Sequence, residues 1–246
     1  MKYRYYGIMA VLMLVGASSA YAMGDKRQAF VGGPTLDTTP IQIQIGDAEY
    51  AIPANYFDLQ PNPACRSERA LFNVIFPDIT PRTKENSREI DFGVGHDHKG
   101  GGILLSYHSS NEPEYNQEGS LRRIFSSRLE NLISYEIFHN EYGLTRHTPK
   151  QGTLPWWGDE LYVDHEKIPK RFLRCSMVDT VPVPVCSFYF YNKKLLVKAS
   201  FNRKLLPEWE TIEDNINKAL DGFYVGPVTQ EKPRCKDSYT DVVGGG

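Results

Sequence analysis

Three consecutive segments late in the chain constrain the fold most strongly, because each has the pattern of a half-buried β-strand. They are RFLRCSMV (171–178), VCSFYFY (185–191) and LLVKASF (195–201), all rich in aromatic and β-branched residues. Asn192-Lys193-Lys194 forms a short turn between the second and third segments, and short turns join antiparallel neighbours. The chain is therefore predicted to contain an antiparallel sheet.

Further strands are predicted before this block. IQIQI (41–45) alternates with a period of two and continues through the turn Gly46-Asp47 into EYAIP (49–53), which predicts a hairpin. EIDFGV (89–94) and ILLSY (103–107) flank GHDHKGGG and predict a second hairpin with a glycine-rich tip. The other predicted strands are 70–76, 135–148 and 159–165, with Gly143 and Gly152 as breaks.

Two helices are predicted. Residues 120–133 place apolar side chains at three-and-four spacing after Ser120, a suitable N-cap. The second helix has Pro207 at its first position, acidic residues in its first turns and Gly222 at its end. Its apolar stripe, predicted to lie on the sheet, is Trp209, Ile212, Ile216, Leu220 and Phe223.

The first 22 residues have the three parts of a secretory signal peptide. Lys2 and Arg4 precede a short apolar run, and Ala20-Tyr21-Ala22 is a suitable cleavage site. We expect 1–22 to be the signal peptide, 23–40 a flexible lead-in, 41–225 a single α+β domain and 226–246 a C-terminal tail held at Cys235. The predicted location is the periplasm, without membrane insertion after cleavage. The mature part carries 26 Lys and Arg against 30 Asp and Glu, a balance that argues against nucleic acid as a partner.

The four cysteines all follow the signal peptide, and an even number in an exported chain indicates disulfide bonds. Three pairings are formally open. The spacing of Cys175 and Cys186, in strands that flank the connection VDTVPVP, favours a local pair, which leaves Cys65 with Cys235. A zinc site is the alternative, but the chain contains no C-x-x-C pair. We therefore predict a disulfide-stabilised fold.

Common catalytic signatures are missing from the sequence, among them the nucleophile elbow, the H-E-x-x-H helix, the P-loop and the dinucleotide fingerprint. We predict no catalytic residue, no metal and no cofactor, so the chain is not expected to be an enzyme. His96 and His98, with His108 nearby, are the alternative, because two histidines at this spacing on an extended backbone point to the same side. A solvated turn explains that segment more simply.

Two further groups invite a functional interpretation. Trp156-Trp157, between Pro155 and Gly158, is the candidate partner-binding site, for a protein or for a carbohydrate. The competing interpretation is one core tryptophan with a neighbour that caps a loop. An acid–base role is weighed against plain solvation for Glu136, His139, Glu141 and His147.

Two regions together resemble a known group of proteins. One is Ile52-Pro53-Ala54-Asn55-Tyr56, and the other extends from Tyr142-Gly143-Leu144 through the cysteine hairpin to Leu206-Pro207-Glu208-Trp209-Glu210. This layout resembles exported proteobacterial proteins, some of which look like immunity proteins encoded beside type VI secretion toxins. The likeness spans about half the chain, and its motifs are structural ones.

The resemblance implies a periplasmic protein that neutralises a secreted toxin by direct contact. It carries no catalytic residue, and its implied partner is a protein. Two alternatives stay open, a periplasmic hydrolase with an unrecognised and metal-dependent site, and an envelope carbohydrate-binding module.

Overall fold

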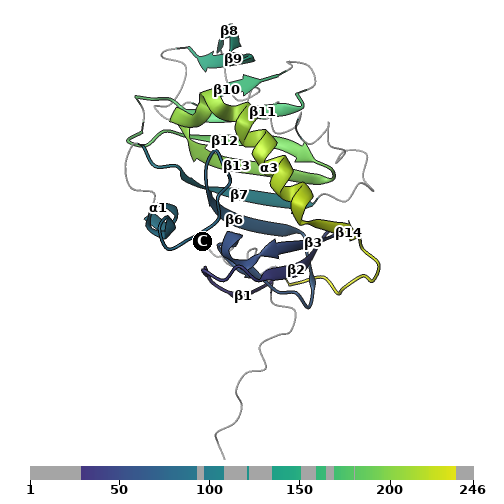
Figure 1. Cartoon of the computed structure of the whole chain (residues 1–246). Helices are drawn as coiled ribbons and strands as arrows, with labels where there is room; N and C mark the ends of the chain where they lie inside the picture. Colours follow the sequence, from purple (N-terminus) through teal and green to yellow (C-terminus); the bar gives the residue numbers. More distant parts are fainter. Residues whose placement is uncertain are drawn as a thin grey trace, which may run out of the picture.

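The computed structural model describes residues 29–92, 97–107, 121, 135–150, 159–164, 169–179 and 181–236. Antiparallel sheet is the main regular structure of the described chain, which also has one long helix (Figure 1). The first strands are β1 (Phe30–Gly32), β2 (Pro40–Ile45), β3 (Ala48–Pro53), β4 (Gln60–Pro61), β5 (Arg66–Ser67), β6 (Arg69–Ile75) and β7 (Gly100–Tyr107). The later strands are β8 (Tyr135–Glu141), β9 (Leu144–Pro149), β10 (Asp159–Val163), β11 (Arg171–Ser176), β12 (Val185–Asn192), β13 (Leu195–Asn202) and β14 (Tyr224–Pro227).

The largest layer is an eight-stranded sheet in the order β6-β7-β13-β12-β11-β10-β9-β8, and every neighbouring pair is antiparallel. The predicted run of strands over 171–201 forms its centre, as β11, β12 and β13. A second sheet, β14-β3-β2-β5, contains the predicted hairpin of β2 and β3. Gly46 in that hairpin turn has a φ of +60°, which glycine adopts without strain. The fold is thus richer in sheet than the predicted α+β class.

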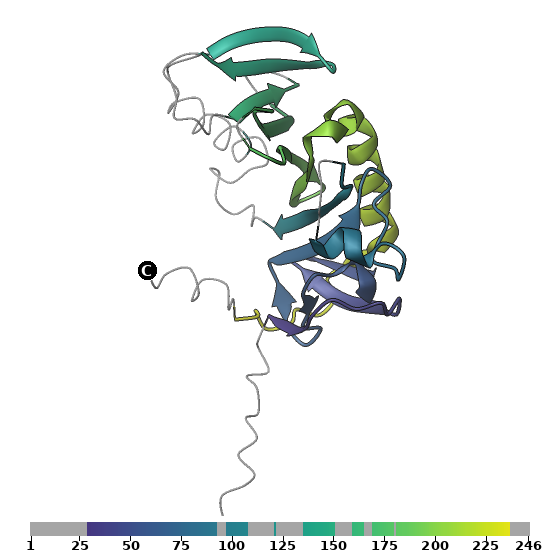
Figure 2. The ribbon, with the colours of Figure 1, turned by 90° about the vertical axis from the view of Figure 1, so that its left-hand side faces the viewer.

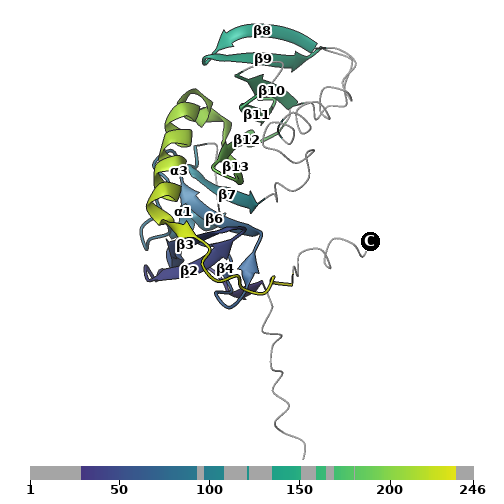
Figure 3. The same cartoon turned by 90° about the vertical axis from the view of Figure 1, so that its right-hand side faces the viewer.

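The long helix α3 (Trp209–Phe223) crosses one face of the large sheet and follows the 3₁₀ turn η3 (Arg203–Glu208) (Figures 1 and 3). The predicted stripe is confirmed, since Trp209, Ile212, Ile216 and Leu220 are buried in the main core. The predicted ends are corrected. Pro207 lies inside the 3₁₀ turn, and the helix continues through Gly222 to Phe223.

The main core lies between this helix and the sheet. Phe188 of β12 contacts Trp209 edge to face, with ring centroids 5.9 Å apart. The face is built by alternation, because burial falls at every second position along β12 and from Val197 to Phe201 in β13. Arg171 of β11 adds a polar link, since its Nε donates to Glu213 Oε2 of α3 at 2.5 Å.

The predicted hairpin of 89–94 with 103–107 is wrong. Residues 87–92 form the short helix α1 (Ser87–Phe92), and β7 begins at Gly100 and pairs with β6 and β13. These positions of the strand require glycine because the backbone is crowded there. A side chain at Gly101 would overlap the carbonyl oxygen of Ser200, and one at Gly100 would lie 2.7 Å from the Glu89 oxygen. The predicted helix over 120–133 lies outside the described residues except for Leu121.

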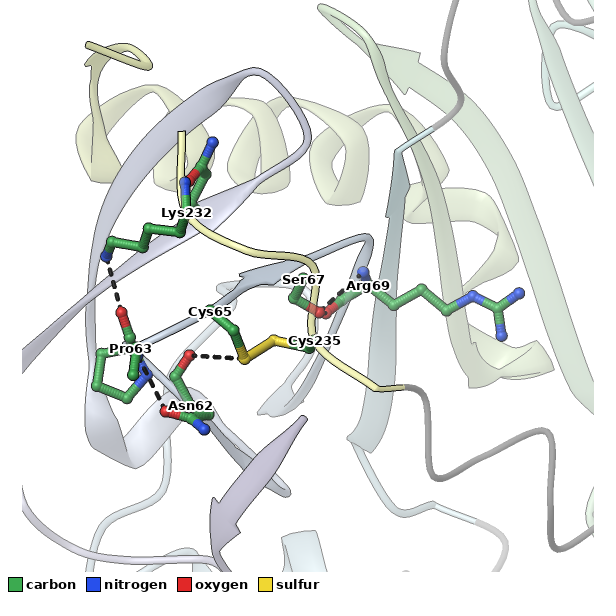
Figure 4. The surroundings of a disulfide bond; sticks show 9 residues. Asn62, Pro63, Cys65, Ser67, Arg69, Lys232 and Cys235 are labelled. Atoms are coloured by element: carbon green, nitrogen blue, oxygen red, sulfur yellow. Dashed lines mark hydrogen bonds between the residues drawn. A yellow bond between two sulfur atoms is a disulfide. The ribbon is translucent and has the colours of Figure 1, made fainter. Parts of the chain in front are cut away.

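Both predicted disulfides are present, Cys65–Cys235 and Cys175–Cys186, and the described chain has no free cysteine. The pair Cys175–Cys186 joins directly opposed residues of β11 and β12, with the Cα atoms 4.0 Å apart. The pair Cys65–Cys235 joins positions 170 residues apart (Figure 4).

The C-terminal segment is held at more points than the predicted one at Cys235. β14 pairs with β3, and the backbones of Arg66 and Arg234 form a parallel bridge. Lys232 also donates from Nζ to the carbonyl oxygen of Pro63 at 2.8 Å (Figure 4). The predicted lead-in likewise contains β1, which pairs with β4. The disulfide therefore closes a region that is already hydrogen-bonded.

Candidate functional site

The end of the large sheet farthest from the small one is formed by β8 and β9 (Figures 2 and 3). Gly143, with a φ of +76°, lies in the turn between these strands, within a segment that the sequence predicted as extended with a break at Gly143. Helix α3 begins beside this turn, and Trp209 Nε1 donates to the Tyr142 carbonyl oxygen at 2.9 Å. The turn is thereby fixed to the start of the helix.

A buried ionic network lies beneath this end of the sheet, centred on Glu160 of β10. The Glu160 carboxylate forms an ion pair with Arg203 and accepts from Tyr162 Oη at 3.1 Å and from Thr148 Oγ1 at 3.2 Å. Arg146 Nη1 lies 3.9 Å from the same carboxylate. Burial, and then the charge of Glu160, raise the pKa of the Tyr162 hydroxyl. Tyr162 therefore remains a hydrogen-bond donor at neutral pH.

Arg146 connects this network to the surface. Its guanidinium contacts both oxygens of Glu141, at 3.0 and 3.1 Å, and its central carbon lies 4.4 Å from the Phe138 ring centroid. Such a cation–π contact holds the aromatic ring in a defined place. The exposed ring therefore rests on an ordered polar base.

The outer surface here is apolar and open. Ile137 is 50% exposed, Phe138 39% and Tyr142 44%. These three belong to one strand and its turn, whereas the other large exposed apolar residues of the described chain lie elsewhere: Val31, Leu36, Val178, Val185 and Val225. We call Ile137, Phe138 and Tyr142 the β8 surface, and it extends over both faces of the strand because Ile137 and Phe138 are adjacent. Clustered exposed apolar residues beside charged ones are typical of protein interaction sites.

The structure describes only some of the binding and metal-ligand residues that the sequence suggested. Trp156, Trp157, His96 and His108 lie outside the described residues. His98 is described, and the described part of the chain contains no group of three potential metal ligands.

The four residues for which an acid–base role was weighed against solvation have different surroundings. Glu136 is exposed on β8, and Glu141 forms an ion pair with Arg146. His147 is buried on β9, and the side chain of His139 is not among those that the structure describes. The β8 surface was missed in the sequence, although a signal exists. Ile137 and Phe138 are adjacent, so a strand must point them to opposite faces.

A cavity of about 250 Å³ lies at the other end of the molecule, where the β2–β3 and β12–β13 turns meet β14. Lys193 lies over the ring of Tyr224, with Nζ 4.0 Å from its centroid, and Lys194 Nζ lies 2.5 Å from Asp47. Burial, followed by the neighbouring Tyr224, raises the pKa of Tyr50 in the cavity wall to about 12. The two lysines at the rim of the cavity thus each contact a side chain of the protein, and Tyr50 in its wall is protonated at neutral pH.

Comparison with known proteins yields a fold. No family model and no curated protein matches the chain. Two solved structures match over 80% of this chain and 97% of their own. They are Smlt3025, an immunity protein of the Stenotrophomonas maltophilia type IV secretion system, at 18% identity and a TM-score of 0.54, and the Neisseria meningitidis iron-regulated outer membrane lipoprotein FrpD, at 9% identity and 0.50.

At these identities the likeness establishes the shared fold alone. One of the two proteins that share the fold is an immunity protein, but it belongs to a type IV system and not to the type VI system that the sequence resemblance implies. Among the described residues, no helix has the length and hydropathy to cross a membrane.

Proposed function

We propose that this chain is an exported protein that binds another protein, and that it is an immunity protein that neutralises a secreted bacterial toxin by direct contact. The observation that carries the proposal is the β8 surface, an exposed apolar cluster supported by buried charge. The fold shared with an immunity protein adds support.

The architecture suits a contact inhibitor because its surface residues are held in place. Phe138 rests on Arg146, Arg146 is held by Glu141, and Tyr142 is fixed through its carbonyl to Trp209. An ordered surface loses little conformational entropy on binding, so more of the contact energy appears as affinity. Aromatic and arginine side chains are also the residue types most often found at binding hot spots.

The periplasm is the proposed location. The N-terminal pattern and the two disulfides support export, since disulfides persist in oxidising compartments. The toxin is proposed to be delivered by a secretion system, of type VI on the sequence resemblance, with type IV as the system of the solved neighbour.

The test is a binding measurement with the toxin encoded beside the gene for this chain. The mature protein and the catalytically inactivated toxin are mixed, and complex formation is measured by calorimetry and size-exclusion chromatography. We expect a 1:1 complex, and cells that export this chain should survive the active toxin. A toxin that neither binds the chain nor loses its toxicity would contradict the proposal.

A further inference from the structure

The two edges of the eight-stranded sheet differ in whether other parts of the chain hydrogen-bond to the edge strand. At the β6 edge the chain covers its own backbone, because Asp58 N donates to the Leu71 carbonyl at 3.2 Å and Ile75 N donates to the Thr80 carbonyl at 2.9 Å. At the β8 edge, no described residue pairs with the outer side of the strand. Open edges readily accept another strand, and proteins usually protect them.

Two common forms of edge protection are missing from the described residues of β8. Its sequence, YEIFHNE, contains no lysine and no proline, the residues that most often block an edge. The register of β8 with β9 is regular from Tyr135 to Phe138 and shifts only after Phe138. A regular stretch of four residues is therefore presented at the edge.

The ladder alternation shows which backbone groups are available. In the cross-strand pair Cys175–Cys186 the Cα atoms are 4.0 Å apart, the short spacing of a pair without mutual hydrogen bonds. Hydrogen-bonded and non-hydrogen-bonded pairs alternate along each ladder, so this pair fixes the pattern for β11, β10 and β9 in turn. By this pattern the backbone N–H and C=O of Phe138 point towards β9, and those of Ile137 point outwards. Ile137 therefore presents both its N–H and its C=O at the open edge.

The hydrogen bonds at the opposite edge check this count. The same alternation, followed through β12, β13 and β7, directs Leu71 and Ile75 of β6 outwards. Leu71 is the residue that bonds to Asp58, and Ile75 is the one that bonds to Thr80, both outside the sheet. The assignment at β8 thus rests on a ladder that is consistent across all eight strands.

We infer that β8 is the docking strand for the partner, and that the partner adds an extended strand to this edge of the sheet. The inference rests on the proposed function and names the part of the partner that is bound. Ile137 and Phe138 are both exposed and point to opposite faces, so an added strand contacts both, whereas a helix laid on one face contacts one. Glu136, exposed on the Phe138 face, selects a partner strand that carries a lysine or arginine opposite it.

The deciding experiment compares two substitutions at one position, with the toxin encoded beside the gene as the probe. Ile137→Ala removes the side chain and keeps the edge N–H, whereas Ile137→Pro removes both. Proline is tolerated at an edge where the N–H faces outwards. We expect Ile137→Pro to weaken binding at least tenfold more than Ile137→Ala. The control Val225→Ala, an exposed aliphatic residue on β14, should leave affinity unchanged.

Thermal unfolding of Ile137→Pro confirms that it is folded, and amide hydrogen exchange of the wild-type complex supplies a readout independent of mutation. The Ile137 amide should exchange at least tenfold more slowly when the toxin is bound. Equal affinities for the two Ile137 variants, with an Ile137 amide that stays unprotected in a stable complex, would overturn the docking strand and leave the proposed function standing. A wild-type protein that does not bind the toxin would instead overturn the proposed function.

Discussion

At the scale of single residues, the Glu160–Arg203 pair is the most consequential contact, because Glu160 is buried and the Arg203 side chain is only 13% exposed. Arg203→Met leaves the Glu160 carboxylate buried beside Tyr162 without its main cation, and breaking a buried pair typically costs about 3–5 kcal/mol. We expect a loss of unfolding free energy in that range, measured by urea denaturation. The double variant Glu160→Gln with Arg203→Met should recover much of the loss, and a double variant no more stable than the single one would contradict this account.

Tyr50 gives the protein a defined alkaline sensitivity. Its pKa is raised to about 12 in the folded protein, whereas an unfolded tyrosine ionises near 10. Between these values the unfolded chain loses the proton first, so stability falls as pH rises. At pH 11 this amounts to about 1 kcal/mol.

Tyr50→Phe should remove that part of the alkaline loss. The measurement is the denaturation midpoint of both proteins at pH 8 and at pH 11. The difference between wild type and variant should shift in favour of the variant at the higher pH. A constant difference would show that Tyr50 ionises equally in both states.

At the scale of elements, two glycines have opposite roles. Gly101 of β7 packs so closely on Ser200 of β13 that an added Cβ would overlap its carbonyl oxygen, while a Cβ at Gly222 of α3 meets nothing within 4 Å. Gly101→Ala should therefore destabilise the protein by several kcal/mol, since the backbone of a central strand must move. Gly222→Ala should stabilise it by about 0.5–1 kcal/mol through helix propensity. Thermal unfolding of the two matched variants measures both signs.

The β8–β9 element carries the proposed binding energy. Phe138→Ala removes the exposed ring and keeps the Arg146–Glu141 pair, and truncation of a hot-spot aromatic costs about 2 kcal/mol or more, near a thirtyfold loss of affinity. We expect that loss in calorimetry with the toxin, with little change in the thermal midpoint. Val185→Ala, an exposed aliphatic residue on another strand, is the matched control. Unchanged affinity for Phe138→Ala would place the interface elsewhere.

At the scale of the whole molecule, the two disulfides restrain the chain unequally. Their residues are separated by 170 and 11 positions, and chain entropy assigns about 5 kcal/mol to the long loop and about 3 kcal/mol to the short one. Cys65→Ser with Cys235→Ser should thus destabilise more than Cys175→Ser with Cys186→Ser. Urea denaturation of both double variants measures the order. The reverse order would mean that the hydrogen bonds of Lys232 and Arg234 already restrain the tail.

The sequence alone determined the strands and the bonds that depend on local pattern. Alternation located β2, β3 and β11 to β13 because one face of each is buried, and three-and-four spacing located α3. The local cysteine spacing left one long-range pair, and both disulfides are present. These features are set by residues near one another along the chain.

Other features depend on contacts between segments that are distant in the sequence, and only the tertiary structure shows them. Gly100 and Gly101 have the composition of a turn, yet they lie in a strand that pairs with β6, at positions where Glu89 and Ser200 leave no room for side chains. Glu160, Arg203 and Arg146 come from three elements, so no local pattern could unite them. The strand order places β8 at the edge of the sheet, with the backbone groups of Ile137 directed outwards. Local sequence does not encode this order, because backbone hydrogen bonds between strands form in the same way whatever the side chains are.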